Sequence, residues 1–264
     1  MPSRPDRTSF APGSQAAMSF TRRAFTPERM DDPEIPRDEL AEALAFIRLV
    51  NARLGGTSAA LRWIERWTFG PGRGSPRRLR VIDLGTGSAD IPLAMVRWGR
   101  QRGVAVEVVA VDSHPTVVAL AREWIAATAP GAQEIELVEG DALRLLDRYE
   151  PGSFDIAHAG MFLHHLPDIE VVTALRIMQR LTRVGVIWND LSRSLLARIA
   201  VRTLVLGRPA AVRHDAIVSV AKGFTRTEAL ALAERAGLER VRYRGHLAGR
   251  FTLVEEPARE WRPR

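Results

Sequence analysis

An alternation of two residue patterns restricts the fold of this chain more than any other feature of its sequence. Short runs rich in β-branched residues predict five strands, at 79–83, 106–112, 134–138, 154–158 and 184–188. Between them lie segments whose apolar residues have helical spacing, at 90–101, 115–128, 142–148 and 169–181. Strands that alternate with helices predict an α/β protein, in which a parallel sheet has helices on both faces and forms a three-layer sandwich.

The C-terminal part of the chain carries clear helix and hairpin signals. Thr225 and Glu228 form a capping-box pattern ahead of "ALALAERAGL", and Gly237 stands where that helix should end. Asp168 similarly precedes the helix that runs into "VVTALRIMQRL". The last two apolar runs, "LERVRY" and "RFTLVE", are separated by a loop of hairpin length. We therefore expect the sheet to finish with an antiparallel pair.

Four stretches of different composition suggest how the chain is organised. Residues 1–30 are rich in Pro, Ser and Arg, which predicts a disordered or loosely attached segment. Residues 31–70 show helical spacing interrupted at Gly55–Gly56, which predicts a helical cap. The turn-rich "GPGRGSPRR" marks the boundary to a main domain at 76–264. Within that domain, the segment 191–224 is longer than a strand–helix connection requires, and we expect it to form a lid.

Composition excludes several classes of protein. The 264 residues include no cysteine, which rules out disulfides, thiolate metal sites and a cysteine nucleophile, and no metal site is predicted. No apolar run approaches the roughly 18 residues of a membrane span, and the N-terminus lacks the apolar middle of a secretion signal. The cytoplasm is the expected location. The net charge is +7, but the arginines are scattered among acids, so a nucleic-acid partner is not favoured.

The stretch "VIDLGTGSADIPLAM", residues 81–95, joins a strand to a helix through a glycine-rich turn of the kind that holds nucleotide-like cofactors. A dinucleotide-binding turn would carry a third glycine where this chain has Asp90. A carboxylate there would repel a pyrophosphate at the helix N-terminus, and Asp83 adds a second negative charge. S-adenosylmethionine (SAM) has no phosphate and carries a sulfonium and an ammonium group. The acidic turn therefore favours SAM over a nicotinamide dinucleotide.

Further acids follow the next two strands. Asp112 ends the second strand, where a carboxylate can accept hydrogen bonds from both ribose hydroxyls. Asp141, in "VEGDAL", follows the third strand, where it or its neighbour can meet the adenine edge. The carboxyl ends of parallel strands meet at the edge where open α/β sheets bind ligands, so these acids and the glycine turn predict one cofactor site.

From about residue 80 to 165 the sequence resembles a class I SAM-dependent methyltransferase. The resemblance lies in "VIDLGTGSAD", "AVDSHPTVVALAR", "EGDA" and "FDIAHAGMFLHHLPD", with Ala89 standing where a glycine is common. It implies a Rossmann-like fold whose seven-stranded, mostly parallel sheet has an antiparallel last strand. It also implies ten cofactor-binding residues: Asp83, Gly85, Thr86, Gly87, Asp90, Asp112, Ser113, Asp141, Ala142 and Ala159.

Three other segments resemble a bacterial branch of small-molecule methyltransferases, often associated with aromatic polyketides or phenolic lipids. They are "RMDDPEIPRDELAEALAFIRLVNARLGG", "VIWNDLSRSLLARIAV" and "RHDAIVSVAKGFTRTEAL". The apolar lid stretch "SLLARIAVRTLVL" also favours a greasy or aromatic acceptor. A small-molecule acceptor is therefore the expected partner.

Methyl transfer requires an acceptor held in line with the methyl group, and a phenol or amine acceptor can also need a general base. His164 and His165 are the candidate catalytic residues, whereas His158, on an apolar strand, is interpreted as a core residue. Candidate substrate-binding residues are Asn189 and Asp190 at the end of the fifth strand, and Arg213 and His214 in the lid. Asn51 and Gly55–Gly56 are expected to approach the cofactor.

Three other functions stay open at this point. A nucleic-acid methyltransferase is disfavoured because there is no cysteine for a pyrimidine adduct and because "HAGMFLHH" lacks the Asn/Asp-Pro-Pro-aromatic motif of base-amino methylation. Asp90 argues against a nicotinamide oxidoreductase. A SAM-binding protein without catalytic activity is compatible with all the motifs.

Overall fold

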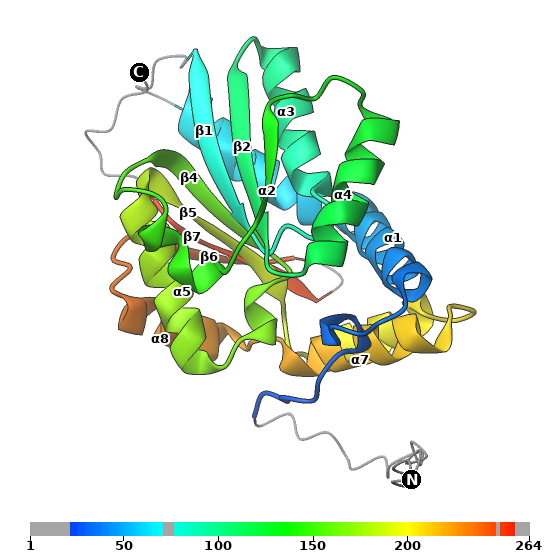
Figure 1. Ribbon diagram of the computed structural model, residues 1–264. Helices are drawn as coiled ribbons and strands as arrows, with labels where there is room; N and C mark the ends of the chain where they lie inside the picture. Colours follow the sequence, from blue (N-terminus) through cyan, green and yellow to red (C-terminus); the bar gives the residue numbers. More distant parts are fainter. Residues whose placement is uncertain (1–21, 71–76, 247–248, 257–264) are drawn as a thin grey trace, which may run out of the picture.

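The computed structural model describes residues 22–70, 77–246 and 249–256. The described chain contains a seven-stranded sheet with the strand order β3-β2-β1-β4-β5-β7-β6 (Figure 1). The strands are β1 (Arg78–Leu84), β2 (Ala105–Asp112), β3 (Ile135–Glu139), β4 (Phe154–Gly160), β5 (Thr182–Leu191), β6 (Val241–His246) and β7 (Arg250–Glu255). All five strands expected ahead of the C-terminal hairpin are present.

Strand direction follows the prediction. Strands β1 to β5 pair in parallel, whereas β7 runs antiparallel between β5 and β6. The strand order reverses between β1 and β4, since β2 and β3 lie on one side of β1 and β4 and β5 on the other. Such a reversal leaves a crevice at the carboxyl ends of the two strands, where open α/β sheets bind ligands.

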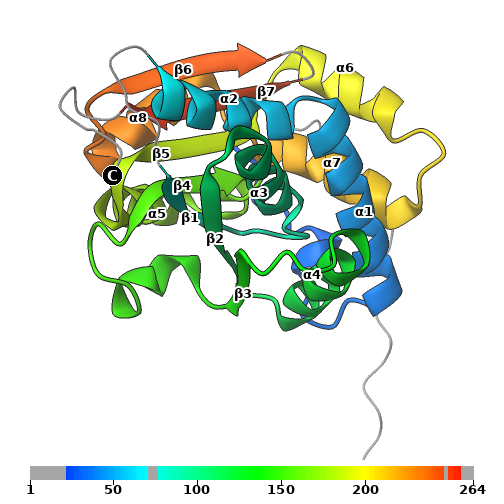
Figure 2. The same ribbon diagram turned by 90° about the horizontal axis from the view of Figure 1, so that it is seen from above.

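Helices cover both faces of the sheet (Figure 2). One face carries α2 (Gly56–Phe69), α3 (Asp90–Arg102) and α4 (Pro115–Thr128); the other carries α5 (Asp168–Leu181), α8 (Arg226–Ala236) and the 3₁₀ helix η2 (Ala142–Asp147). Each layer buries its own apolar cluster against the strands, so the predicted Rossmann-like three-layer sandwich is confirmed. No helix in the described ranges is long and apolar enough to span a membrane.

Three helices lie at the carboxyl-end edge of the sheet: α1 (Arg37–Arg53), α6 (Leu195–Leu204) and α7 (Ala210–Lys222). The helical cap expected over 31–70 therefore consists of α1, because α2 packs on the sheet with Trp63 and Trp67 in its core. The two helices separate at Gly55, whose φ of 83° is left-handed and ends α1, as the sequence predicts. Residues 71–76, in the expected linker, lie outside the described residues.

Residues 22–32, here called the N-terminal strap, pack onto the domain and include the 3₁₀ helix η1 (Arg29–Asp31). Arg23 is only 8% exposed and donates to the backbone oxygens of His164, Leu166 and Lys222. Its guanidinium also pairs with Asp168 and lies 4.0 Å from the ring centroid of Phe224. The prediction of a loosely attached segment over 1–30 is therefore wrong for residues 22–30; residues 1–21 lie outside the described part.

The helix-end signals are confirmed at α8. Thr225 Oγ1 accepts a hydrogen bond from the Glu228 backbone N–H, and the Glu228 carboxylate accepts one from the Thr225 N–H. Gly237 ends the helix with a φ of 87°. Asp168 differs from the expectation, because Pro167 is the N-cap of α5 and Asp168 is its first helical residue.

The capping box at α8 gives a stability prediction. Thr225→Ala should lower the free energy of unfolding by about 1 kcal/mol, because it leaves the Glu228 N–H without its acceptor. Urea denaturation measures this change. Thr225→Ser is the matched control, and its free energy of unfolding should stay close to that of the parent protein. Equal stability of the alanine and serine variants would show that the cap contributes nothing.

Candidate active site

A cavity of about 1080 Å³ opens at the carboxyl ends of the parallel strands. One half is lined by the glycine turn and the strand-end acids, and the other by apolar residues of α1, α6 and α7. The apolar half includes Phe46, Val50, Leu54, Met161, Leu191, Ala197, Val201, Leu204, Val212, Ala216 and Val220. Single-ligand pockets usually measure about 300–1,000 Å³, so this cavity has room for a cofactor and a small second molecule.

The glycine turn is held by close packing. Gly85 and Gly87 have left-handed φ values of 62° and 54°. A Cβ on Gly85 would overlap the ring of Phe162, so this position requires glycine for space as well as for conformation. Ala89 is also left-handed, with a φ of 54°, and its buried methyl packs with Ala110 and Ile125. The alanine in place of the usual glycine carries backbone strain of about 1–2 kcal/mol.

Asp83 and Asp112 act within the protein as well as facing the cavity. Asp83 accepts a hydrogen bond from Thr86 Oγ1 at 2.6 Å, and its other oxygen lies 2.5 Å from Nδ1 of the fully buried His158. Asp112 accepts from the backbone N–H groups of Gly87 and His114 at 3.0 and 3.1 Å. Burial raises the pKa of Asp112 above its usual value. The two carboxylates therefore fix the conformation of the glycine turn.

The predicted cofactor residues come together almost completely. Asp83, Gly85, Thr86, Gly87, Asp90, Asp112, Ser113, Asp141 and Ala142 all line the cavity. Asp141 also caps η2 by accepting from the Leu143 N–H at 2.8 Å. Ala159 is the exception: its side chain is fully buried in the core cluster on the α5 side of the sheet. His158 and Gly160, its neighbours on β4, line the cavity instead.

A buried polar chain links the cofactor half to the last strand. Asn51 donates to Asp90 at 3.1 Å and accepts from Arg250 Nη2 at 3.0 Å. Burial raises the pKa of Asp90 and lowers the pKa of Arg250 to about 10. Asn51 approaches the cofactor half as predicted. Arg250 was missed, since the sequence signal for it is no more than its place at the start of the predicted last strand.

The predicted substrate-binding residues do not line the cavity. Asn189 and Asp190 are fully buried, and Asn189 donates to the backbone oxygen of Gly56. Arg213 and His214 are exposed on the outer side of α7. Asp215 is the buried member of "RHD", and it accepts from the backbone N–H groups of Arg29 and Met30 in the strap. These four assignments are therefore corrected.

His164 and His165 both reach the cavity, from the 3₁₀ helix η3 (Leu163–His165). His164 is buried, and its Nδ1 donates to Asp190 at 2.7 Å. Burial would raise the pKa of Asp190, but His164, together with N–H donors from Trp188 and Leu191, holds it below its usual value. Asp190 therefore fixes the ring of His164 rather than contacting a ligand.

His165 has a carboxylate partner of its own and remains partly accessible. Its Nδ1 lies 2.9 Å from Asp31 of the strap, and its side chain is 18% exposed. Burial alone would lower the pKa of His165, but the carboxylates of Glu28 and Asp31 raise it above its usual value, against a smaller opposite effect of Lys222. The positive charge of His165 also lowers the pKa of Asp112, against the larger rise that burial produces.

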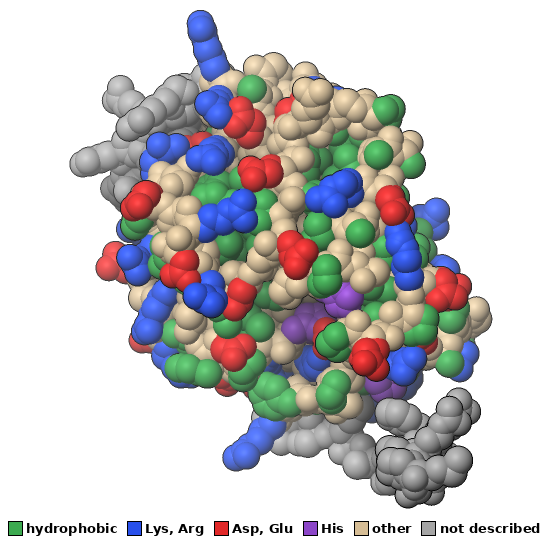
Figure 3. Space-filling view, viewed as in Figure 1, with side chains coloured by type: hydrophobic (Ala, Val, Ile, Leu, Met, Phe, Trp, Pro, Cys, Tyr) green, Lys and Arg blue, Asp and Glu red, His purple; other side chains and the backbone are tan. Residues whose placement is uncertain are grey.

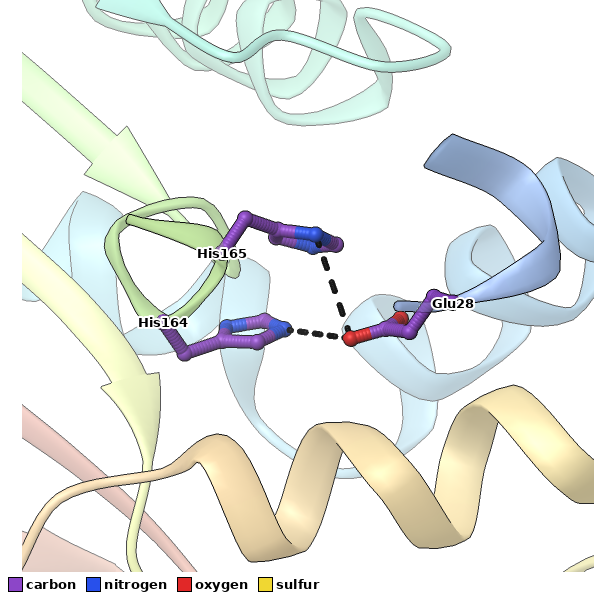
Figure 4. Close-up of side chains that lie close together, drawn as sticks. All are labelled: Glu28, His164 and His165. Carbon is purple, nitrogen blue, oxygen red and sulfur yellow. Dashed lines mark ion pairs between the residues drawn. The ribbon is translucent and has the colours of Figure 1, made fainter. Parts of the chain in front are cut away.

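Glu28 faces both histidines (Figure 4). Its Oε1 lies 3.7 Å from His164 Nε2 and 3.8 Å from His165 Nδ1, and the three donor atoms lie within 4.8 Å of one another. Two histidines and a glutamate are zinc-ligand types. However, the ammonium of the buried Lys222 lies 3.1 Å from the same Glu28 oxygen and 3.3 Å from Asp31. Because a cation already balances these carboxylates, the donor set fits an ion-paired cluster better than a metal site.

Comparison with known proteins finds a protein family that part of this chain matches. Residues 81–185 match the family model described as a methyltransferase domain. This part of the chain is therefore similar to a methyltransferase domain, in agreement with the resemblance to class I SAM-dependent methyltransferases seen in the sequence. No sequence among the curated proteins matches.

Solved structures share the fold of this chain at low sequence identity. An O-methyltransferase family protein from Burkholderia thailandensis has a TM-score of 0.59 and 18% identity, over 88% of this chain and 63% of that one. Human N-acetylserotonin methyltransferase in complex with SAM has a TM-score of 0.58 and 14% identity, over 84% and 57%. Magnesium protoporphyrin IX methyltransferase from Synechocystis, with bound SAH, has a TM-score of 0.53 and 13% identity, over 78% and 83%. This chain spans less than two thirds of the length of the first two proteins.

The role predicted for Asp112 can be tested by binding. Asp112→Ala should weaken binding of S-adenosylhomocysteine by about 1.5–3 kcal/mol, because it removes the acceptor predicted for the ribose hydroxyls and releases the Gly87 N–H. Isothermal titration calorimetry measures the affinity. Asp147→Ala removes an exposed acid outside the cavity and is the control. Unchanged affinity in the Asp112 variant would refute the ribose assignment.

Proposed function

We propose that this methyltransferase transfers the methyl group of SAM to an oxygen of a small aromatic or lipid-like acceptor. The observation that carries the proposal is the division of one cavity into an acidic glycine-turn half and an apolar half, with His165 at its wall. The O-methyltransferase from Burkholderia thailandensis and the human N-acetylserotonin enzyme have the same fold, which is consistent with a small acceptor.

The proposed residue roles follow from position. SAM, when bound, supplies an electrophilic methyl group on a sulfonium. Gly85, Gly87 and Asp112 would hold it, with Asp141 and Ala142 beside the adenine. The apolar side chains of α1, α6 and α7 would orient the acceptor and exclude water, so that the acceptor oxygen faces the methyl carbon.

We assign the general base to His165 rather than His164. Asp31 accepts from Nδ1 of His165, which leaves Nε2 as the nitrogen able to take a proton from an acceptor hydroxyl. The equivalent nitrogen of His164 is buried and faces Glu28. His164, held by Asp190, would therefore position η3 and its neighbour His165.

The proposal is tested with radiolabelled SAM and a panel of phenols, hydroxylated alkylbenzenes and aromatic amines. Label should enter at least one phenol. His165→Gln should lower kcat for that phenol by about 10²–10⁴-fold and leave the affinity for S-adenosylhomocysteine unchanged. His214→Gln, which changes an exposed histidine outside the cavity, is the control. Tight binding of S-adenosylhomocysteine with no labelled product from any acceptor would favour a non-catalytic binding protein.

The raised pKa of His165 predicts a pH dependence. A general base must be neutral, so kcat/KM should rise with pH through an apparent pKa above about 6.5. Asp31→Asn removes a charge and hydrogen bond that raise this pKa, so the rising limb should move to lower pH. Asp38→Asn removes one exposed negative charge elsewhere on the surface and should leave the profile in place. A limb unmoved by Asp31→Asn would exclude His165 as the titrating base.

A nucleic-acid substrate is the second candidate because of the net charge of +7. Figure 3 shows histidine side chains on the face that carries the site, with basic and acidic side chains interspersed around them. A continuous basic track is the electrostatic footprint expected of a nucleic-acid enzyme, and this mixture does not favour one. Label transfer to RNA in the same assay would favour a nucleic-acid substrate over the small-molecule acceptor.

A further inference from the structure

An exposed apolar surface lies on the lid. Within the described residues, Leu195, Leu196 and Ile199 of α6 are 62%, 78% and 56% exposed, and Leu206, two residues after the helix, is 74% exposed. We call these four residues the α6 patch. A single exposed leucine on a protein surface is ordinary, but a cluster of large apolar side chains marks a contact surface.

The α6 patch points away from the protein. Leu195 and Ile199 are one helical turn apart on the exposed face of α6, whereas Ala197 and Val201 are buried on the other face and line the apolar half of the cavity. Figure 2 shows α6 at the outer margin of the molecule, beside α7. One side of this short helix therefore contacts the acceptor space and the other is left uncovered.

The charged residues in the sequence around the α6 patch are all basic. From Leu191 to His214 the chain contains five arginines and no acid. Arg202, Arg208 and Arg213 are exposed, while Arg193 is paired with Glu228. Exposed leucines on a helix flanked by arginines are the combination that binds the interface of an anionic bilayer.

We propose that the α6 patch docks onto the surface of an anionic phospholipid bilayer, with Leu195, Leu196, Ile199 and Leu206 entering the interface. A second copy of the chain is a poorer occupant, because a two-fold dimer through this surface would bring two arginine-rich segments together. A nucleic acid would pair with the arginines but leave the leucines in water.

Docking would place the acceptor half of the cavity close to the membrane, because one face of α6 lines the cavity and the other carries the patch. An apolar acceptor could then pass from the bilayer beneath α6 into the site, a consequence that rests on the proposed function. The docking itself does not depend on methyl transfer, so it can be measured without any acceptor.

The test is co-sedimentation of the full chain with vesicles of phosphatidylcholine alone or mixed equally with phosphatidylglycerol. We expect binding to the mixed vesicles that weakens as salt is raised. The double variant Leu195→Ser/Leu196→Ser should lower the partition coefficient at least tenfold. Arg202→Gln/Arg213→Gln should lower it about 30-fold, the equivalent of about 1 kcal/mol for each arginine.

Ile169→Ser is the matched control, because Ile169 is 63% exposed at the start of α5, outside the patch. It should bind mixed vesicles as the parent does. All variants should retain affinity for S-adenosylhomocysteine, which separates a failure of docking from a failure of the proposed function. The proposal is overturned if the parent does not bind mixed vesicles, if Ile169→Ser is as weak as the leucine variant, or if light scattering shows a dimer that Leu195→Ser/Leu196→Ser dissolves.

Discussion

The buried carboxylate of Asp190 holds the histidine segment against the sheet. It accepts hydrogen bonds from both the backbone N–H and Nδ1 of His164, from the indole N–H of Trp188 and from the backbone N–H of Leu191. A buried carboxylate is costly without such donors, so the four bonds fix one arrangement of η3 relative to β5. The strap depends on that arrangement in turn, because Arg23 binds the backbone oxygens of His164 and Leu166, and Asp31 pairs with His165.

Much of the fold and of the cofactor half could be predicted from the sequence, because the signals are local. A strand, a glycine turn and a helix have one common geometry, so Gly85, Gly87 and Asp112 reach the same edge whatever the rest of the chain does. The Thr225–Glu228 box is equally local, since both partners lie within one helical turn. In each case the residues that decide the structure are neighbours in sequence or follow successive strands.

The errors concern the direction of side chains and contacts between distant segments. Ala159, Asn189 and Asp190 directly follow the predicted strands and lie on β4 and β5, where side chains alternate between faces, and the sequence does not fix which ones turn toward the cavity. In "RHD", the helix turns Asp215 inward and its two basic neighbours outward. Glu28 and Asp31 stand on either side of the boundary predicted at residue 30, and their contacts to Lys222 span 191 or more residues, so no local sequence pattern predicts these contacts.

The position of β7 has a consequence for how the protein is made. β7 is the last strand of the described chain, yet it lies inside the sheet, between β5 and β6, and brings Arg250 to Asn51. A ribosome releases the residues of β7 after both strands that they join, so β5 keeps an unpaired edge until β7 has been synthesised. An unpaired edge strand is a template for association with other chains. Completion of the sheet, and with it protection of the β5 edge, therefore requires the six residues of β7, the last strand of the described chain.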